Sequence, residues 1–221
     1  MSYSGDVYNT KEDFAGSKFI ETGNFKVYYT EIKDVYIIEP RVFHDARGYF
    51  FESYSQMALA RAGIRNVFGQ DNQSHSSYGT VRGLHFQKSP HAQAKLVRVL
   101  NGMVLDVAVD LRAGSKTYGN HVAVRLSDQN KLQLLVPRGF AHGFSVLSET
   151  AEFAYKCDNY YNKKAEGGIR FDDADLNINW DLDPANAVVS DKDKLLPTLE
   201  DYRPFKKRLI FYDKMSSLLA K

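Results

Sequence analysis

The residues of this chain that could do chemistry are scattered over widely spaced stretches. His85 lies in residues 81–87, a pattern typical of a strand, and an imidazole titrates near neutral pH, where a general base works. Lys95 begins the next β-rich run, His142 lies in a segment with one Pro and two Gly, and Tyr155 lies late in a further run. Taken singly, each has an ordinary structural explanation, such as a hydrogen-bonded core histidine or a solvated strand end.

Short strands joined by turns are predicted to position these side chains. Residues 103–111 alternate with a period of two, which predicts an apolar face opposite one that carries Asp106 and Asp110. Asn101-Gly102 predicts a hairpin between residues 95–100 and this strand. Two further hairpins are predicted from the pairs 122–126 with 132–136 and 144–147 with 151–156. Repeated short strands predict an all-β sandwich or barrel.

Few helices are expected beside these strands. Residues 55–62 predict one, because Ser55 can cap its start and Gly63 can end it. Strands are predicted at 35–38 and 49–54, with a turn between them at 45–48, and residues 160–200 read as rich in loops. Residues 208–211 predict a strand, followed by a short terminal helix.

Composition excludes several classes of protein. The formal net charge of +2 gives no electrostatic footprint for nucleic acid, and no apolar run approaches the roughly 20 residues that cross a bilayer. The N-terminus lacks the apolar core of a signal peptide. Cys157 is the single cysteine, which excludes an internal disulfide and fits a reducing compartment. We therefore expect a cytoplasmic protein without membrane or nucleic-acid partners.

Six motifs of the chain, matched in order and spacing, carry a family resemblance. They are the segments 82–87, 95–98, 106–110, 139–144, 151–156 and 168–170. Together they resemble the dTDP-4-dehydrorhamnose 3,5-epimerase family, which makes intermediates of dTDP-rhamnose biosynthesis. The resemblance implies an all-β, cupin-like jelly-roll β-sandwich or barrel with a few short helices, assembled as a homodimer. The resemblance places the epimerase domain at 35–200. Outside it, we expect an N-terminal extension or arm at 1–34 and a C-terminal extension at 201–221 that packs on the domain.

The family's reaction epimerises a nucleotide-diphosphate 4-keto-6-deoxy sugar at C3 and C5. The 4-keto group acidifies both carbons, so the reaction needs a base, a group that stabilises the enolate, and an acid on the opposite face. By motif, the resemblance implies that His85 is the base, Lys95 the enolate-stabilising cation and Tyr155 the acid. Asp193 is implied as the carboxylate partner of His85, although Asp191 lies only two residues away.

The same resemblance implies a set of substrate-binding residues. Guanidinium groups suit the diphosphate because they present a planar fork of donors. Tyr160 or Tyr161 could stack on the base or the sugar, and Asp106 could orient His142 from a neighbouring strand. The implied substrate-binding residues are Arg47, Glu52, Gln70, Asn72, Arg82, His142 and Tyr161. Gly83 is expected to bend its strand, because Arg82 and His85 must both face the substrate.

Three other functions remain open from the sequence. A metal-dependent cupin would need two histidines one residue apart followed by a glutamate, whereas this chain has His85-Phe86-Gln87 and a repelling cation at Lys95. We therefore expect neither a metal nor a cofactor. A non-catalytic sugar-binding jelly roll would not explain the joint presence of His, Lys, Tyr and Asp. A relative that inverts only C3 or C5, or that acts on another nucleotide-sugar, could share the whole set.

Overall fold

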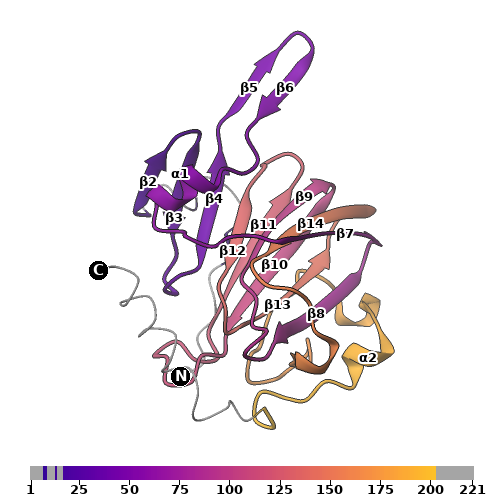
Figure 1. Ribbon diagram of the computed structural model, residues 1–221. Coiled ribbons are helices and arrows are strands. Elements are labelled where there is room, and N and C mark those ends of the chain that lie inside the picture. Colours follow the sequence, from indigo (N-terminus) through magenta and orange to yellow (C-terminus); the bar gives the residue numbers. More distant parts are fainter. Residues whose placement is uncertain (1–6, 9–12, 14–16, 203–221) are drawn as a thin grey trace, which may run out of the picture.

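Two facing β-sheets form the body of the protein in the computed structural model, which describes residues 7–8, 13 and 17–202 (Figure 1). Sheet A has the order β1-β11-β10-β13-β8-β15, and β16 pairs with β8. Its strands are β1 (Val7–Tyr8), β8 (Thr80–Gln87), β10 (Met103–Asp110), β11 (His121–Ser127), β13 (Phe140–Val146), β15 (Glu166–Gly168) and β16 (Val188–Val189).

Sheet B lies against sheet A and has the order β2-β3-β4-β12-β9-β14-β7. Its strands are β2 (Phe19–Thr22), β3 (Phe25–Tyr29), β4 (Tyr36–Pro40), β7 (Gln70–Ser77), β9 (Lys95–Asn101), β12 (Gln133–Val136) and β14 (Thr150–Cys157). A separate hairpin of β5 (Val42–Asp45) and β6 (Gly48–Phe51) projects from the body (Figure 1). The predicted all-β, cupin-like sandwich is confirmed.

Strand partners differ from the sequence prediction at all three expected hairpins. The turn at Asn101-Gly102 carries the chain from β9 in sheet B to β10 in sheet A, so these strands do not pair. The connections from β11 to β12 and from β13 to β14 cross between the sheets in the same way. A turn signal specifies where the chain reverses, but it does not specify which strand lies beside the next one.

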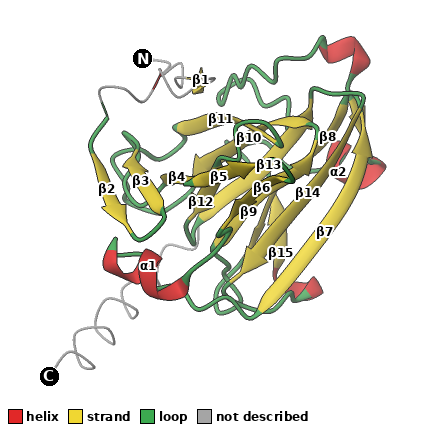
Figure 2. Ribbon diagram, turned by 90° about the horizontal axis from the view of Figure 1, so that it is seen from above, coloured by secondary structure: helices red, strands yellow, loops and turns green. Residues whose placement is uncertain are grey.

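Sheet A is buried on both faces, which explains its apolar strands. Between the sheets, Val104 and Ala108 of β10 join one core with residues of β9, β12 and β14. The opposite face of β10 packs against residues 169–202, which contribute Leu176 and Trp180 to a second core. The predicted alternation of residues 103–111 is therefore present, but both faces are buried. Figure 2 shows the two sheets from above.

The short helices lie outside the sheets. Helix α1 (Gln56–Arg61) agrees with the predicted helix, and the Ser55 side chain accepts from the Ala58 N–H at 3.3 Å. Helix α2 (Asp191–Lys194) begins at Ser190, whose side chain accepts from the Asp193 N–H at 3.1 Å. Turns at η2 (Lys163–Ala165) and η3 (Pro184–Asn186) interrupt the predicted loop-rich region.

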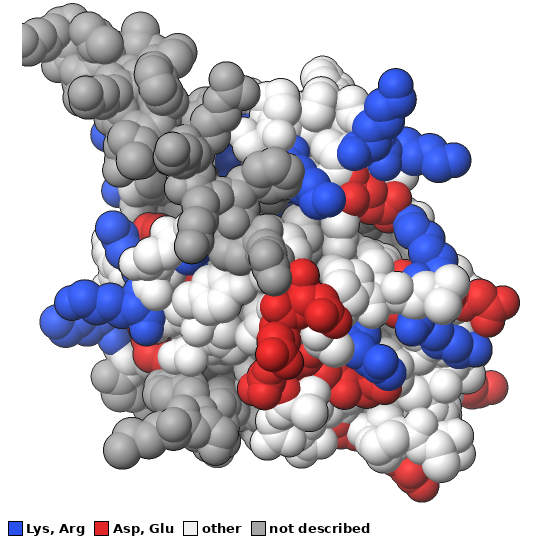
Figure 3. All heavy atoms as spheres, turned by 90° about the horizontal axis from the view of Figure 1, so that it is seen from below, with Lys and Arg blue, Asp and Glu red and all other residues white. Residues whose placement is uncertain are grey.

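The predicted ends of the chain are described only in part. Strands β2 and β3 lie within the expected N-terminal arm, and β3 pairs with β4 in sheet B. The predicted strand at 208–211 and the terminal helix lie outside the described residues. Among the described residues, no helix is long and apolar enough to cross a membrane. On the face shown in Figure 3, acidic side chains gather near the centre and basic ones lie around them.

Candidate active site

The chemistry-bearing side chains line the space between the two sheets. His85 of β8 and His142 of β13 are register partners in sheet A. Lys95 of β9 and Cys157 of β14 are register partners in sheet B, and Tyr155 lies on the same inward face of β14, packed against the core between the sheets. The two histidines therefore lie on one wall of the site, and Lys95 and Tyr155 lie on the opposite wall.

A bulge in β8 turns Arg82 and His85 to the same face. Arg82 pairs with Phe144 and His85 pairs with His142, so the residues are three apart in β8 but two apart in β13. The extra residue in β8 shifts the alternation of its side chains by one position, so the side chains of Arg82 and His85 both point inward. Gly83 lies at this bulge with a φ of +110°, and a Cβ there would lie 2.6 Å from the His142 carbonyl oxygen. The expected bend at Gly83 is present.

Asp193, and not Asp191, reaches the His85 imidazole. The His85 Nε2 atom lies 2.7 Å from Asp193 Oδ1, and Asp193 Oδ2 accepts from the Gly83 N–H at 3.3 Å. Burial alone would raise the pKa of Asp193, but the hydrogen bonds and the charge of His85 outweigh it, so the pKa lies below the ordinary value. Asp191 is 99% exposed and contacts Lys194. His85 is therefore held by a buried carboxylate.

A second histidine–carboxylate pair lies beside the first. His142 Nε2 lies 3.0 Å from each carboxylate oxygen of Asp106, and both residues are buried. This is the pairing predicted from the sequence. Burial lowers the pKa of His142, the charge of Asp106 opposes this, and the charge of Lys95 lowers the pKa further. A neutral imidazole with its N–H donated to Asp106 fits this environment.

Lys95 and Tyr155 form the opposite wall. The Lys95 Nζ atom lies 5.7 Å from the centre of the Tyr155 ring. Burial lowers the pKa of Lys95, whereas the nearby Cys157, Asp106 and Glu166 favour its charged form. Burial raises the pKa of Tyr155, so its phenol carries a proton at neutral pH. These two groups can supply a positive charge and a proton to the same small molecule.

Three predicted substrate-binding residues are joined by hydrogen bonds at the edge of the site. The Gln70 side chain donates to Asn72 Oδ1 at 3.1 Å and accepts from the Tyr161 N–H at 3.1 Å. The Tyr161 hydroxyl donates to Glu166 at 3.0 Å. Arg82 donates from Nε to Ser76 Oγ at 3.0 Å. Hydrogen bonds therefore join polar groups of β7 to the segment before β15, and join Arg82 of β8 to β7.

Arg47 and Glu52 are not brought to this site within one chain. Arg47 lies at the turn of the projecting β5–β6 hairpin, where its guanidinium pairs with Asp45 at 2.6 Å and its side chain is 89% exposed (Figure 1). Glu52 follows β6 and accepts from Asn24 at 3.3 Å. The predicted contact of Arg47 and Glu52 with the substrate is therefore not made within a single chain.

Other residues that shape the site were not selected from the sequence. Ser190 begins α2, and a serine three residues before Asp193 is a capping signal that could have favoured Asp193. Glu166 and Lys192 form an ion pair beside the site, and their sequence spacing gave no signal. Among the described residues, there is no group of three or more His, Cys, Asp or Glu side chains arranged to hold a metal ion.

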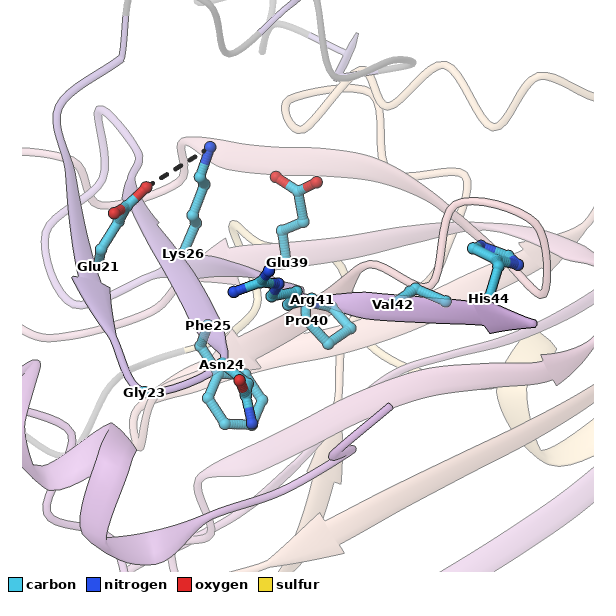
Figure 4. Close-up of a pocket in the computed structure, with 10 residues that line it drawn as sticks. All are labelled: Glu21, Gly23, Asn24, Phe25, Lys26, Glu39, Pro40, Arg41, Val42 and His44. Carbon is cyan, nitrogen blue, oxygen red and sulfur yellow. Dashed lines mark ion pairs between the residues drawn. The ribbon is translucent and has the colours of Figure 1, made fainter. Parts of the chain in front are cut away.

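A separate hollow lies on the outside of the molecule. It has a volume of about 540 Å³ and is lined by residues of β2 to β5 and the connections between them. Figure 4 shows Lys26 beside Glu21, with 3.6 Å between the charged groups, and Arg41 and His44 farther along the wall. None of the predicted catalytic residues lines this hollow.

Comparison with known proteins identifies one family. Residues 29–201 match the family model described as dTDP-4-dehydrorhamnose 3,5-epimerase. The chain is 53% identical over 168 residues to the dTDP-4-dehydrorhamnose 3,5-epimerase of Shigella flexneri, which covers 76% of this chain and 92% of that protein.

Solved structures give the same result. The crystal structure of dTDP-4-dehydrorhamnose 3,5-epimerase from Elizabethkingia anophelis is 54% identical, has a TM-score of 0.79, and covers 82% of this chain and 100% of its own. A dTDP-6-deoxy-D-glucose-3,5-epimerase from Legionella pneumophila was solved in complex with dTDP-4-keto-L-rhamnose. It is 45% identical with a TM-score of 0.78, covering 81% of this chain and 95% of its own.

Proposed function

The chain belongs to the dTDP-4-dehydrorhamnose 3,5-epimerase family of isomerases, and from that premise we propose how its residues act. The proposed reaction inverts C3 and C5 of dTDP-4-dehydro-6-deoxyglucose and yields dTDP-4-dehydrorhamnose. The observation that carries the proposal is the separation of His85 and Tyr155 on opposite walls. Epimerisation removes a proton from one face of a carbon and adds one to the other, so it needs a base and an acid on opposite sides.

His85 is the proposed base. Its Nε2–H donates to Asp193, which leaves Nδ1 free to take the proton from the carbon next to the ketone. The electron pair of the broken C–H bond forms the enolate, and Asp193 stabilises the imidazolium that results. The Lys95 ammonium stabilises the negative oxygen at C4. Tyr155 then gives its phenolic proton to the opposite face of the carbon. Solvent accepts the proton held by His85 and supplies one to Tyr155, so both groups are reset for the second carbon.

The second carbon is inverted by the same groups. The polar rim of Gln70, Asn72, Arg82 and Tyr161 binds the nucleotide diphosphate, and His142 contacts the sugar. Both walls stay in place while the sugar ring presents C3 and C5 in turn. The chemistry uses proton transfer and charge stabilisation by side chains, and the proposal includes neither a metal nor a cofactor.

A homodimer is the proposed assembly. The β5–β6 hairpin projects from the body (Figure 1). It exposes the aromatic side chains of Phe43, Tyr49 and Phe50. Exposed aromatic groups favour an interface, and a second copy is the partner that the family resemblance implies. In such a dimer, the hairpin can carry Arg47 and Glu52 to the site of the other copy. This would reconcile their predicted role with their position.

Two further assignments belong to the proposal. The domain is assigned to residues 35–200, with an N-terminal arm before it whose strands β2 and β3 extend sheet B. The predicted packing of the C-terminal extension concerns residues 203–221, which lie outside the described residues. The protein is assigned to the cytoplasm, because its single cysteine, Cys157, is free and buried.

The proposed reaction is tested by the configuration of the product. We expect NMR of dTDP-4-dehydro-6-deoxyglucose incubated with the protein to show the sugar inverted at both C3 and C5. Inversion of one centre would assign the chain to a single-centre reaction. Tight binding without any inversion would contradict the proposal and favour a binding protein.

A further inference from the structure

Glu166 connects two parts of the site that the mechanism treats separately. It begins β15 and is the register partner of Gln87 in β8, two residues after His85. Its carboxylate is 20% exposed and has two partners: Lys192 Nζ donates to Oε1 at 2.5 Å, and the Tyr161 hydroxyl donates to Oε2 at 3.0 Å. These contacts hold a half-buried charge between two different segments of the chain.

Each partner of Glu166 leads to a different group of site residues. Tyr161 bonds through its N–H to Gln70, which bonds to Asn72. Lys192 immediately precedes Asp193 in α2, and Asp193 bonds to His85. Hydrogen bonds and one short helix therefore run from the proposed nucleotide-binding rim to the proposed catalytic base, with Glu166 in the middle.

We propose that Glu166 is a positioning residue that couples the nucleotide-binding rim to the His85–Asp193 pair. The inference rests on the proposed function. Helix α2 has only four residues, so its hold on Asp193 depends on contacts outside the helix. The Glu166–Lys192 pair is one such contact, and the Tyr161 hydroxyl fixes the same carboxylate from the substrate side. A nucleotide that orders Tyr161 would then stabilise the orientation of the base.

The charge of Glu166 also acts on the opposite wall. Lys95 faces Asp106 and His142 from sheet A, Tyr155 and Cys157 from β14, and Glu166 from β15. Burial lowers the pKa of Lys95, and the carboxylate of Glu166 opposes that shift. Removal of the Glu166 carboxylate should therefore lower the pKa of Lys95 further. Loss of the Glu166–Lys192 ion pair, here called the tether, should not lower it if the carboxylate remains.

Three variants separate the tether from the charge. E166Q removes both, K192M removes the tether and keeps the carboxylate, and K192R keeps the ion pair. We expect kcat to fall by about 10-fold in E166Q and K192M, because small displacements of a reacting group are costly, and to recover in K192R. The basic limb of the pH–rate profile should move to lower pH in E166Q alone. The double variant E166Q/K192M should be no slower than E166Q.

Matched controls make the outcome decisive. Glu152 of β14 is a carboxylate that pairs with Gln73 away from the site, so E152Q should keep the wild-type kcat and pH profile. The Lys192 side chain is 61% exposed, so its variants test the tether even if E166Q does not fold. If the wild type turns over substrate and K192M, E166Q and E152Q all share its kcat and pH profile, the inference is wrong but the proposed function stands. Absence of wild-type epimerisation would overturn the proposed function and the inference with it.

Discussion

At the scale of single residues, the side chains that contact His85 determine what its imidazole can do. The sequence motif identified His85, Lys95, His142 and Tyr155, because the family resemblance covers their segments. It implied Asp193 as the carboxylate partner of His85, with Asp191 only two residues away, and the structure brings Asp193 to the imidazole. Glu166 and Lys192 could not be predicted, because their pairing depends on how β15 and α2 fold back onto β8.

Replacement of Asp193 by Asn should reduce kcat by roughly 100-fold or more, because the imidazolium loses its stabilising charge and the His85 tautomer loses its partner. Steady-state kinetics would measure the change. D191N is the matched control in the same helix, because Asp191 is solvent-exposed, and it should keep nearly full activity. Equal losses in both variants would contradict the assignment of Asp193.

Asp110 should make the stability of the fold depend on pH. It is fully buried, and burial alone would raise its pKa, but Arg112, Ser115 and Thr117 donate to it and hold the pKa below the ordinary value. Because the folded-state pKa is depressed, the stabilisation is present above the unfolded-state pKa of about 4 and is lost as pH falls below it.

The variant D110N should therefore be about 3 kcal/mol less stable than the wild type at pH 7, since it leaves the Arg112 charge without its buried partner. Denaturant unfolding at several pH values would show the difference shrinking below about pH 4. D34N removes the half-exposed partner of Arg112 and should cost less than about 1 kcal/mol. A constant difference between D110N and wild type from pH 7 to pH 3 would contradict the role given to Asp110.

At the scale of elements, the sequence predicted where strands and turns lie better than it predicted their partners. Helix α1 and the alternating strand β10 agree with their patterns, because capping and periodicity are local properties. The three expected hairpins were wrong, because the two strands of each pair follow one another in sequence but lie in opposite sheets, and that arrangement depends on contacts distant in sequence. The bulge at Gly83 was expected only because two side chains had to face one ligand.

Gly83 is the element-scale feature that a single substitution can test. In G83A, the new Cβ would collide with the His142 carbonyl at a backbone angle that L residues rarely adopt. We expect a loss of stability of about 2 kcal/mol or more and reduced kcat, because the bulge orients both Arg82 and His85. Thermal unfolding and kinetics would measure the two effects.

Gly114 provides the control for backbone strain. Its φ is +79°, but a Cβ there has no heavy atom within 4 Å, so G114A should cost about 1 kcal/mol and leave kcat unchanged. If G83A were as stable and as active as G114A, the close packing of β8 against β13 would not be needed to position the base.

At the scale of the whole molecule, the projecting hairpin is the feature that one chain does not explain. Sequence motifs assigned Arg47 and Glu52 to substrate binding, yet the hairpin leads Arg47 away from the barrel of its own chain. Local patterns predicted its turn and its second strand, β6, but not its first strand, β5. They also carry no information about the symmetry that would bring a second copy to it. The roles of these two residues are therefore to be tested in the proposed dimer.

A mixture of two inactive variants tests this arrangement. We expect R47A and H85N each to lose at least about 90% of the activity, and a mixed dimer to regain one complete site, because Arg47 and His85 of that site come from different copies. Recovery of activity after the two variants are unfolded and refolded together would be measured against each variant refolded alone. No recovery, together with proven mixed dimers, would place Arg47 outside the shared site.

The most direct test of the two-walled mechanism is deuterium incorporation from heavy water, followed by NMR of the 4-keto sugar. We expect the wild-type protein to introduce deuterium at both C3 and C5, and H85N to introduce it at neither. We expect Y155F still to exchange protons while forming inverted product roughly 100-fold more slowly. Deuterium incorporation by H85N at the wild-type rate, or none by the wild type at either carbon, would contradict the proposed mechanism.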